Sequence, residues 1–265
     1  MMRKMKTLMA LGLGLVALLG CAKFRDNPCR QAGYVDAMKN KAEAYYQAGE
    51  MIEALKAAKA AEACNPKDPE LFYWIGLIHY RQGRLYDAIE YFRKSISIDR
   101  NYMESRMALG LVYLELGRHD EAIEQFELVT KYYLFERPFE AYNNLGYAYL
   151  KKGDYARAEA ALNQARRINP NYCPTYCNLG ELYSQLGRSS EAIRNLQRAI
   201  ELCPQGYARP HFLLALEYGK LNNYPRACQE LRRARQVENA PEREQIDDYL
   251  RLYNCPALTR GAQNR

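Results

Sequence analysis

The chain has 265 residues, of which 48% are hydrophobic and 26% charged, so its composition is that of a folded protein and excludes a disordered chain. The formal net charge is +7, and three positive charges, Arg3, Lys4 and Lys6, lie within a first stretch of twenty residues that carries no acid. The remainder therefore has a charge of about +4, with acids and bases interleaved. A nucleic-acid-binding face needs concentrated basic residues, so we expect no nucleic-acid partner.

The first twenty residues have the layout of a secretory signal. After the basic start, Leu8 to Leu19 form an apolar run, and Gly20 then precedes Cys21. The run is shorter than the roughly 20 residues that a bilayer-spanning helix needs. The pattern predicts a signal peptide over residues 1–20.

The end of this leader, Leu18-Leu19-Gly20-Cys21, resembles the lipobox of bacterial lipoproteins. The resemblance implies that Cys21 becomes the first residue and carries acyl chains, with residues 21–34 as a membrane tether. In such lipoproteins an Asp after the cysteine is typical of the inner membrane, so Ala22 favours the periplasmic face of the outer membrane. The alternative is an ordinary secretory signal followed by a chance cysteine.

An internal repeat follows the leader. One copy shows its residue types, namely Gly110, Tyr113, Gly117, Ala122 and Phe126. Copies begin near residues 35, 69, 103, 139, 173 and 208, at spacings of 34 to 36 residues. This resembles the tetratricopeptide repeat in period and residue types.

The resemblance implies an all-α fold, a right-handed superhelical solenoid of six antiparallel helix pairs. The predicted repeats lie near 35–68, 69–102, 103–138, 139–172, 173–207 and 208–241. Small residues such as Gly110 and Ala122 are expected where helices cross closely. Residues 242–265 are predicted to form a capping helix and a tail, since Ile246, Tyr249 and Leu250 fall on one side of a helix.

The first helices of tetratricopeptide proteins line a partner-binding groove, and the corresponding positions here are apolar and rich in tyrosine. They are Tyr46, Tyr73, Leu77, Tyr80, Arg81, Met107, Leu111, Leu114, Asn143, Tyr147 and Leu150. Such a surface favours a protein partner, for example an amphipathic helix. For any one of these residues, burial between repeats is the alternative. A carboxylate clamp is not expected, because its positions hold Lys39, Glu43 and Trp74.

Seven cysteines remain after Cys21, and an exported protein is expected to pair them. Helical-hairpin geometry brings together the ends that carry Cys173 and Cys203, and the other predicted pairs are Cys29–Cys64 and Cys228–Cys255. Cys177 is then left over, as a buried free thiol. Metal binding by Cys173 and Cys177 is the alternative, but no histidine accompanies them.

No catalytic, metal or cofactor site is predicted. His79, His119 and His211 lie in different repeats, and the glycines belong to the repeat pattern. We therefore expect neither an enzyme nor a small-molecule substrate. An enzyme accessory or transferase would need a catalytic segment outside the repeats, and none is evident.

A closer resemblance lies in the third repeat, which is longer than its neighbours. The stretch YYLFERP at 132–138, followed by YNNLG at 142–146, is similar to the pilotin lipoproteins of type IV pili. The resemblance implies an outer-membrane lipoprotein that binds a secretin subunit and promotes its localisation and multimerisation. The alternative is a general envelope adaptor that recruits peptidoglycan enzymes or proteases.

Overall fold

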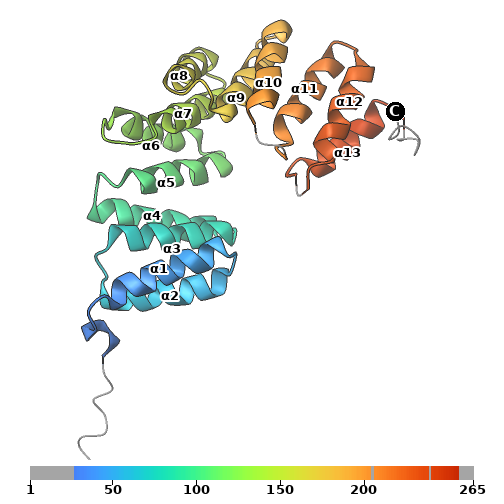
Figure 1. Cartoon of the computed structure of the whole chain (residues 1–265). Coiled ribbons are helices and arrows are strands. Elements are labelled where there is room, and N and C mark those ends of the chain that lie inside the picture. Colours follow the sequence, from blue (N-terminus) through green and yellow to red (C-terminus); the bar gives the residue numbers. More distant parts are fainter. Residues whose placement is uncertain (1–26, 204–205, 239, 257–265) are drawn as a thin grey trace, which may run out of the picture. The chain divides into compact units, whose positions relative to one another are not determined.

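The computed structural model describes residues 27–203, 206–238 and 240–256, and these residues form helices and no strand (Figure 1). The predicted signal peptide and Cys21 lie outside the described residues. The chain divides into two compact units, with unit 1 ending at Tyr102 and unit 2 beginning at Met103.

Unit 1 contains two antiparallel helix pairs. A short 3-10 helix, η1 (Pro28–Arg30), precedes them, and the four helices are α1 (Tyr34–Gln47), α2 (Met51–Cys64), α3 (Pro69–Arg81) and α4 (Leu85–Ile98). Alanines of α2, including Ala54 and Ala58, pack against Leu71 and Ile75 of α3 in one core. One pair could not bury its apolar face alone, so the two pairs share this core.

Unit 2 contains four further pairs and a final helix. The helices are α5 (Met103–Glu115), α6 (His119–Lys131), α7 (Pro138–Lys152), α8 (Tyr155–Ile168), α9 (Cys173–Gln185), α10 (Ser189–Leu202), α11 (Arg209–Lys220), α12 (Tyr224–Arg235) and α13 (Arg243–Leu252). The predicted all-α fold of tetratricopeptide helix pairs is confirmed, with one described pair for each of the six repeats.

In the first five pairs the two helices are joined by a tight turn at the second repeat glycine, and in the last pair Asn222 takes this place. Gly117 has a φ of +72°, a left-handed conformation that glycine adopts without a Cβ clash. Beyond it, the backbone N–H of Arg118 donates to the carbonyl of Tyr113 at 2.8 Å. This hydrogen bond satisfies a carbonyl that the end of the helix leaves free. Because the turn reverses the chain and α6 starts directly after it, α6 packs antiparallel to α5.

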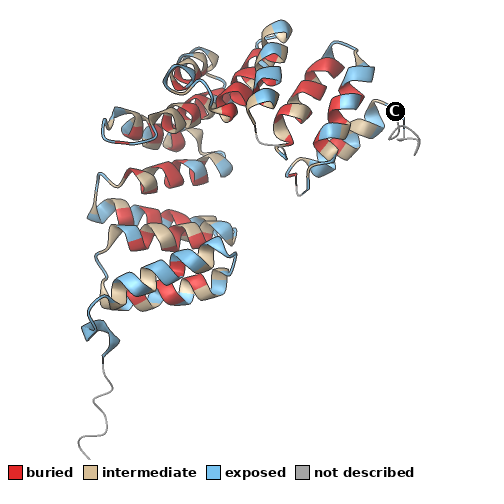
Figure 2. Ribbon diagram, viewed as in Figure 1, coloured by how far each residue is buried: buried red, intermediate tan, exposed pale blue. Residues whose placement is uncertain are grey.

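The helices of a pair cross closely at the first repeat glycine. A Cβ added to Gly110 would lie 2.5 Å from Cε1 of Phe126, whose ring is fully buried. The same arrangement recurs at Gly76, Gly146 and Gly180, which face Phe92, Leu162 and Leu196. The buried positions therefore gather on the facing sides of the helices (Figure 2).

Helix α13 covers the last pair of unit 2. Ile246 is fully buried and packs in one cluster with Phe212 and Leu231. The hydroxyl of Tyr253 occupies the space that a Cβ on Gly219 would need. This is the packing expected of a capping helix, because it removes an exposed apolar face from the end of the repeats.

Three disulfide bonds tie helix ends together. They join Cys29 to Cys64 in unit 1, and Cys173 to Cys203 and Cys228 to Cys255 in unit 2. The cysteines in them are 35, 30 and 27 residues apart, and they are the pairs expected from hairpin geometry. Cys177 is a buried free thiol.

Candidate partner-binding face

Aromatic rings form a continuous row on unit 1. The ring of Tyr46 on α1 contacts Trp74 on α3, Trp74 contacts Tyr73, and Tyr73 contacts Tyr102, with 5.7 Å between ring centroids at each step. All four residues are half-buried. The guanidinium of Arg81 lies 5.1 Å from the centroid of Tyr46. We call these five residues the ladder face.

The ladder face includes two residues that the sequence analysis did not assign to the site. From the sequence, Trp74 served only as a reason to expect no carboxylate clamp, and Tyr102 lies beyond the end of α4. Both take part because they contact Tyr73. The adjacency of Tyr73 and Trp74 in one helix was the available signal for Trp74. The signal for Tyr102 was hairpin geometry, because Tyr73 lies near the start of α3 and Tyr102 follows α4 of the same pair.

The other predicted groove residues of unit 1 are also accessible. Leu77 and Tyr80 are half-buried on α3, and Arg81 is exposed. Large aromatic and aliphatic side chains in this partly exposed state are suited to contact a protein partner, since they offer apolar area that is already ordered.

In unit 2, some of the predicted groove residues are accessible and others are buried. Leu111 is 39% exposed, and Leu114 and Tyr147 are half-buried. The remaining predicted groove residues of this unit, Met107, Asn143 and Leu150, are buried, which is the alternative left open for them, so they offer little surface to a partner.

Asn143 shows why burial prevailed. Its Oδ1 accepts a hydrogen bond of 2.9 Å from Nδ2 of Asn178, which lies on the first helix of the next pair. Its own Nδ2 donates to Oδ1 of Asn144 at 3.1 Å. The amide therefore links neighbouring first helices, because a buried polar group needs partners of its own.

A charged cluster surrounds Tyr147 in unit 2. The carboxylate of Glu181 lies 2.6 Å from Nζ of Lys151 and 2.7 Å from Nη2 of Arg209. Both cations also lie over the Tyr147 ring, at 5.0 and 5.1 Å from its centroid. Burial by itself would raise the pKa of Glu181, but Arg209 and Lys151 lower it overall. The cluster places two cations against the Tyr147 ring.

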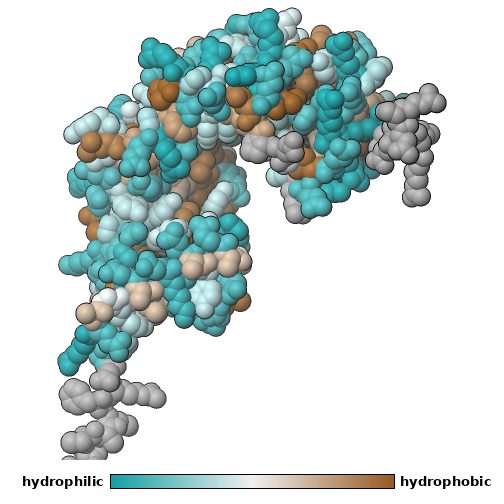
Figure 3. Space-filling view, in the orientation of Figure 1, coloured by the Kyte–Doolittle hydropathy of each residue, from teal (hydrophilic) through white to brown (hydrophobic). Residues whose placement is uncertain are grey.

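The stretch that resembles pilotins presents two apolar side chains at a turn. The N–H of Phe135 donates to the carbonyl of Tyr132 at 3.1 Å, which places Tyr133 and Leu134 at the apex. These two residues are 88% and 59% exposed, whereas Phe135 is buried. Such apices usually hold Gly, Asn, Asp or Pro, so this pair is an unusual exposure of apolar surface. Elsewhere, the face shown in Figure 3 is largely hydrophilic with separate hydrophobic patches.

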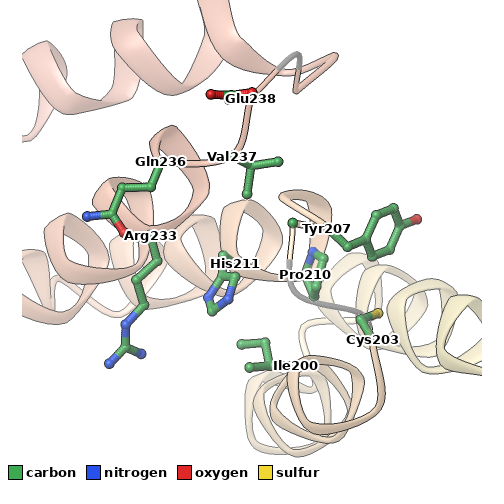
Figure 4. Close-up of a pocket in the computed structure, with 10 residues that line it drawn as sticks. Ile200, Cys203, Tyr207, Pro210, His211, Arg233, Gln236, Val237 and Glu238 are labelled. Atoms are coloured by element: carbon green, nitrogen blue, oxygen red, sulfur yellow. The ribbon is translucent and has the colours of Figure 1, made fainter.

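One pocket of about 450 Å³ lies among the ends of α10, α11 and α12. Figure 4 shows the imidazole of His211 between Ile200 and Val237. Nδ1 of His211 lies 2.6 Å from Oε2 of the buried Glu230, which also accepts a hydrogen bond of 2.7 Å from Arg233. The pair of partners satisfies the Glu230 carboxylate within the protein.

Two histidines and the free cysteine have defined local surroundings. His79 is buried and stacks on Tyr91 at 5.2 Å, and burial lowers its pKa. His211 belongs to a different unit. Among the described residues, no group of three His, Cys, Asp or Glu side chains could hold a metal ion. Burial raises the pKa of the Cys177 thiol to about 12, so the thiolate is strongly disfavoured.

None of the described helices is long and apolar enough to cross a bilayer. Stacked helix pairs with a partly exposed aromatic face define a helical-repeat protein of the class that binds other proteins. The tetratricopeptide repeat family matches residues 69–134 and 138–205, and a second tetratricopeptide model matches residues 42–83. The chain belongs to the tetratricopeptide repeat family.

Curated relatives are similar over parts of their length. The BBSome complex member BBS4 of Bos taurus is 22% identical over 206 residues, which cover 78% of this chain and 39% of BBS4. The TPR repeat-containing protein MJ1428 of Methanocaldococcus jannaschii is 31% identical over 139 residues, 50% of this chain and 23% of that protein. The chain thus spans less than two fifths of the length of either.

Two similar solved structures belong to proteins of about the same extent. The PilF protein of Pseudomonas aeruginosa matches with a TM-score of 0.66 and 16% identity, over 82% of this chain and 97% of PilF. PilW, described as a widely conserved type IV pilus biogenesis factor, matches with a TM-score of 0.70 and 19% identity, over 80% of this chain and 97% of PilW. At these identities the likeness establishes the shared fold.

Proposed function

We propose that this protein is an outer-membrane lipoprotein that binds a secretin subunit and promotes its localisation and multimerisation in type IV pilus biogenesis. The observation that carries the proposal is the match to PilF and PilW along 97% of each of those chains. A pilus biogenesis factor of the same fold and extent supports a related role here. The lipobox-like Leu18-Leu19-Gly20-Cys21 supports a membrane anchor for it.

The proposed mechanism is linkage. Acyl chains on Cys21 hold the protein at the membrane, where each buried methylene contributes about 0.8 kcal/mol and more than one chain is needed for stable anchoring. Because η1 and the Cys29–Cys64 disulfide hold the chain from Pro28 onward, the free tether comprises residues 22–27 and extends at most about 20 Å. The first-helix faces bind the secretin subunit, and its concentration at the assembly site rises because binding and anchoring act together.

The apolar residues on the first helices are the proposed contacts. In unit 1 these are the ladder face with Leu77 and Tyr80, and in unit 2 they are Leu111, Leu114 and Tyr147. Tyrosine and tryptophan supply large, rigid contact areas with a polar tip, which is why they dominate binding energy in many interfaces.

Deletion of the gene tests the proposal. Secretin multimers, which are separated from monomers by gel electrophoresis, should be lost and should return with the wild-type gene. Cys21→Ala should fail to restore them at the outer membrane, and Tyr73→Ala with Leu111→Ala should fail through lost binding. Tyr86→Ala, at a tyrosine that is 72% exposed on α4, is the matched control and should complement. Unchanged multimers in the deletion strain would exclude the secretin role.

An affinity pull-down from envelope extract separates this proposal from the general adaptor. Capture of a secretin subunit that depends on Tyr73 and Leu111 supports the pilus role. Capture of peptidoglycan enzymes or proteases in its place, with the same dependence, would replace it with the adaptor role.

A further inference from the structure

The ladder face of unit 1 has an acidic edge. At the N-terminal ends of α1 and α3, Nζ of Lys39 lies 3.9, 3.0 and 2.6 Å from carboxylate oxygens of Asp36, Asp68 and Glu70. Asp36 and Glu70 keep 77% and 48% of their side chains exposed, so their negative charge is available to a ligand. One ammonium group cannot neutralise three carboxylates.

The surroundings do not cancel this charge. Glu43, one turn beyond Lys39 on α1, is exposed and adds a further carboxylate. Lys67, in the turn before α3, adds one cation. With Arg30 of η1, which is exposed just before α1, this edge carries four carboxylates, two ammonium groups and one guanidinium, so a net negative charge remains.

The opposite edge carries one cation, Arg81, and the turn after α1 also holds the exposed Glu50. Arg81 is exposed at the C-terminal end of α3, with its guanidinium over the ring of Tyr46. It is eleven residues beyond Glu70 on the same helix, which corresponds to about 16 Å along a helix axis. Trp74 falls between Glu70 and Arg81 along α3.

The aromatic row crosses the helices obliquely, from Tyr46 beside Arg81 near the end of α1 to Tyr102 just before the start of α5. Its members come in order from α1, from α3 and from the segment after α4. An apolar ligand over Tyr73 and Trp74 would have the carboxylates at the start of α3 on one flank and the guanidinium at its end on the other. Charges at a rim select ligands by repelling like charges, so this rim is selective.

We propose that the ladder face takes an amphipathic helix whose apolar side lies on the aromatic row, with basic residues on one flank and acidic residues on the other. The inference rests on the protein-binding role proposed above and specifies the chemistry of the bound segment. Its basic flank meets the carboxylates around Lys39, and its acidic flank meets Arg81. Acids at helix starts and a cation at a helix end also stabilise the helices themselves, but that effect gives no selectivity among ligands.

The chain contains its own reporter, because Trp74 is its single tryptophan and lies in the row. The test uses the chain from Ala22 onward, which keeps every described helix. It is titrated with three 18-residue helical peptides that lack tryptophan and share one leucine face. The first carries lysine on one flank and glutamate on the other, the second lysine on both, and the third glutamate on both.

The mixed peptide should shift the Trp74 emission and bind at least about tenfold more tightly than either of the others. Added salt should reduce this preference, because exposed charges are screened. Arg81→Glu should move the preference to the peptide with lysine on both flanks. Lys56→Glu, a charge reversal on α2 whose side chain is 68% exposed, should leave the preference unchanged.

Glu70→Gln provides a second variant, and it should weaken the discrimination against the peptide with glutamate on both flanks. Equal affinities for the three peptides, or an unchanged preference in Arg81→Glu and Glu70→Gln, would overturn the inference. Secretin capture that still depends on Tyr73 would then leave the proposed function intact. If secretin is not captured but the peptide selectivity is retained, the proposed function is excluded and the inference about the ladder face stands.

Discussion

Replacement of Gly110 by alanine tests whether close crossing of the helices explains the repeat glycine. A Cβ at this position would lie 2.5 Å from Cε1 and 2.7 Å from Cζ of Phe126, a fully buried ring. Overpacking of this kind costs about 1–3 kcal/mol. Alanine restores about 0.5–1 kcal/mol of helix stability relative to glycine. We therefore expect a net loss of about 1–2 kcal/mol in the free energy of unfolding.

The chain supplies a matched comparison for this variant. The last repeat has Ala215 and Leu231 at the equivalent positions, both fully buried in one cluster. An alanine opposite a leucine is therefore tolerated, and Gly180→Ala, which faces Leu196, should change stability by less than Gly110→Ala. The double variant Gly110→Ala with Phe126→Leu should lose less free energy of unfolding than the sum of the losses in the two single variants.

Guanidinium denaturation followed by far-UV circular dichroism, with the disulfides oxidised, measures these differences. The double-mutant cycle should give a coupling of about 1 kcal/mol or more, as expected for residues in contact. A Gly110→Ala chain as stable as the wild type, or strictly additive effects, would refute the steric explanation of the glycine.

Three further predictions concern stability and reactivity. Cys173→Ser with Cys203→Ser should lower the free energy of unfolding by about 3–4 kcal/mol, because the bridge closes a loop of about 30 residues in the unfolded chain; equal denaturation midpoints would contradict this. A carboxylate with a lowered pKa stabilises the fold above its unfolded pKa and ceases to do so as pH falls through its folded pKa, so Glu181→Gln should lose less stability than the wild type as pH falls below 4.5. Glu201→Gln, at an exposed pair with Arg198, is the control. The same loss of stability at acid pH in the wild type and in Glu181→Gln would contradict this prediction. Cys177 should resist iodoacetamide at pH 8 in the native chain and react in guanidinium, so modification at equal rates in both states would show that the thiol is not protected.

The period of the sequence determined the helix pairs. Six copies at spacings of 34 to 36 residues place a glycine or alanine at each close crossing and a turn residue between the two helices. Each of these features is local, because a helical hairpin forms from residues close in the sequence. The capping role of α13 also followed from a local pattern, the apolar side that includes Ile246 and Tyr249. The cysteine positions at helix ends similarly pointed to the three disulfides that the structure contains.

The accessible surface was decided by tertiary structure. The period assigns a residue to a first helix, but it does not give the distance to the neighbouring pair. Met107 and Leu150 had the same repeat positions as accessible residues such as Tyr73 and Tyr80, and they are nevertheless buried. Burial depends on side chains 30 or more residues away, as the hydrogen bond between Asn178 and Asn143 shows.

The order of the aromatic row had the same cause. Tyr102 reaches Tyr73 because α4 packs antiparallel against α3 and ends near its start, and Trp74 reaches Tyr46 only because α1 and α3 lie next to each other. The sequence alone determined the repeat, its helices and their crossings, since these depend on neighbours within one hairpin. Which side chains remain available to a partner was determined only by the packing of one hairpin against the next.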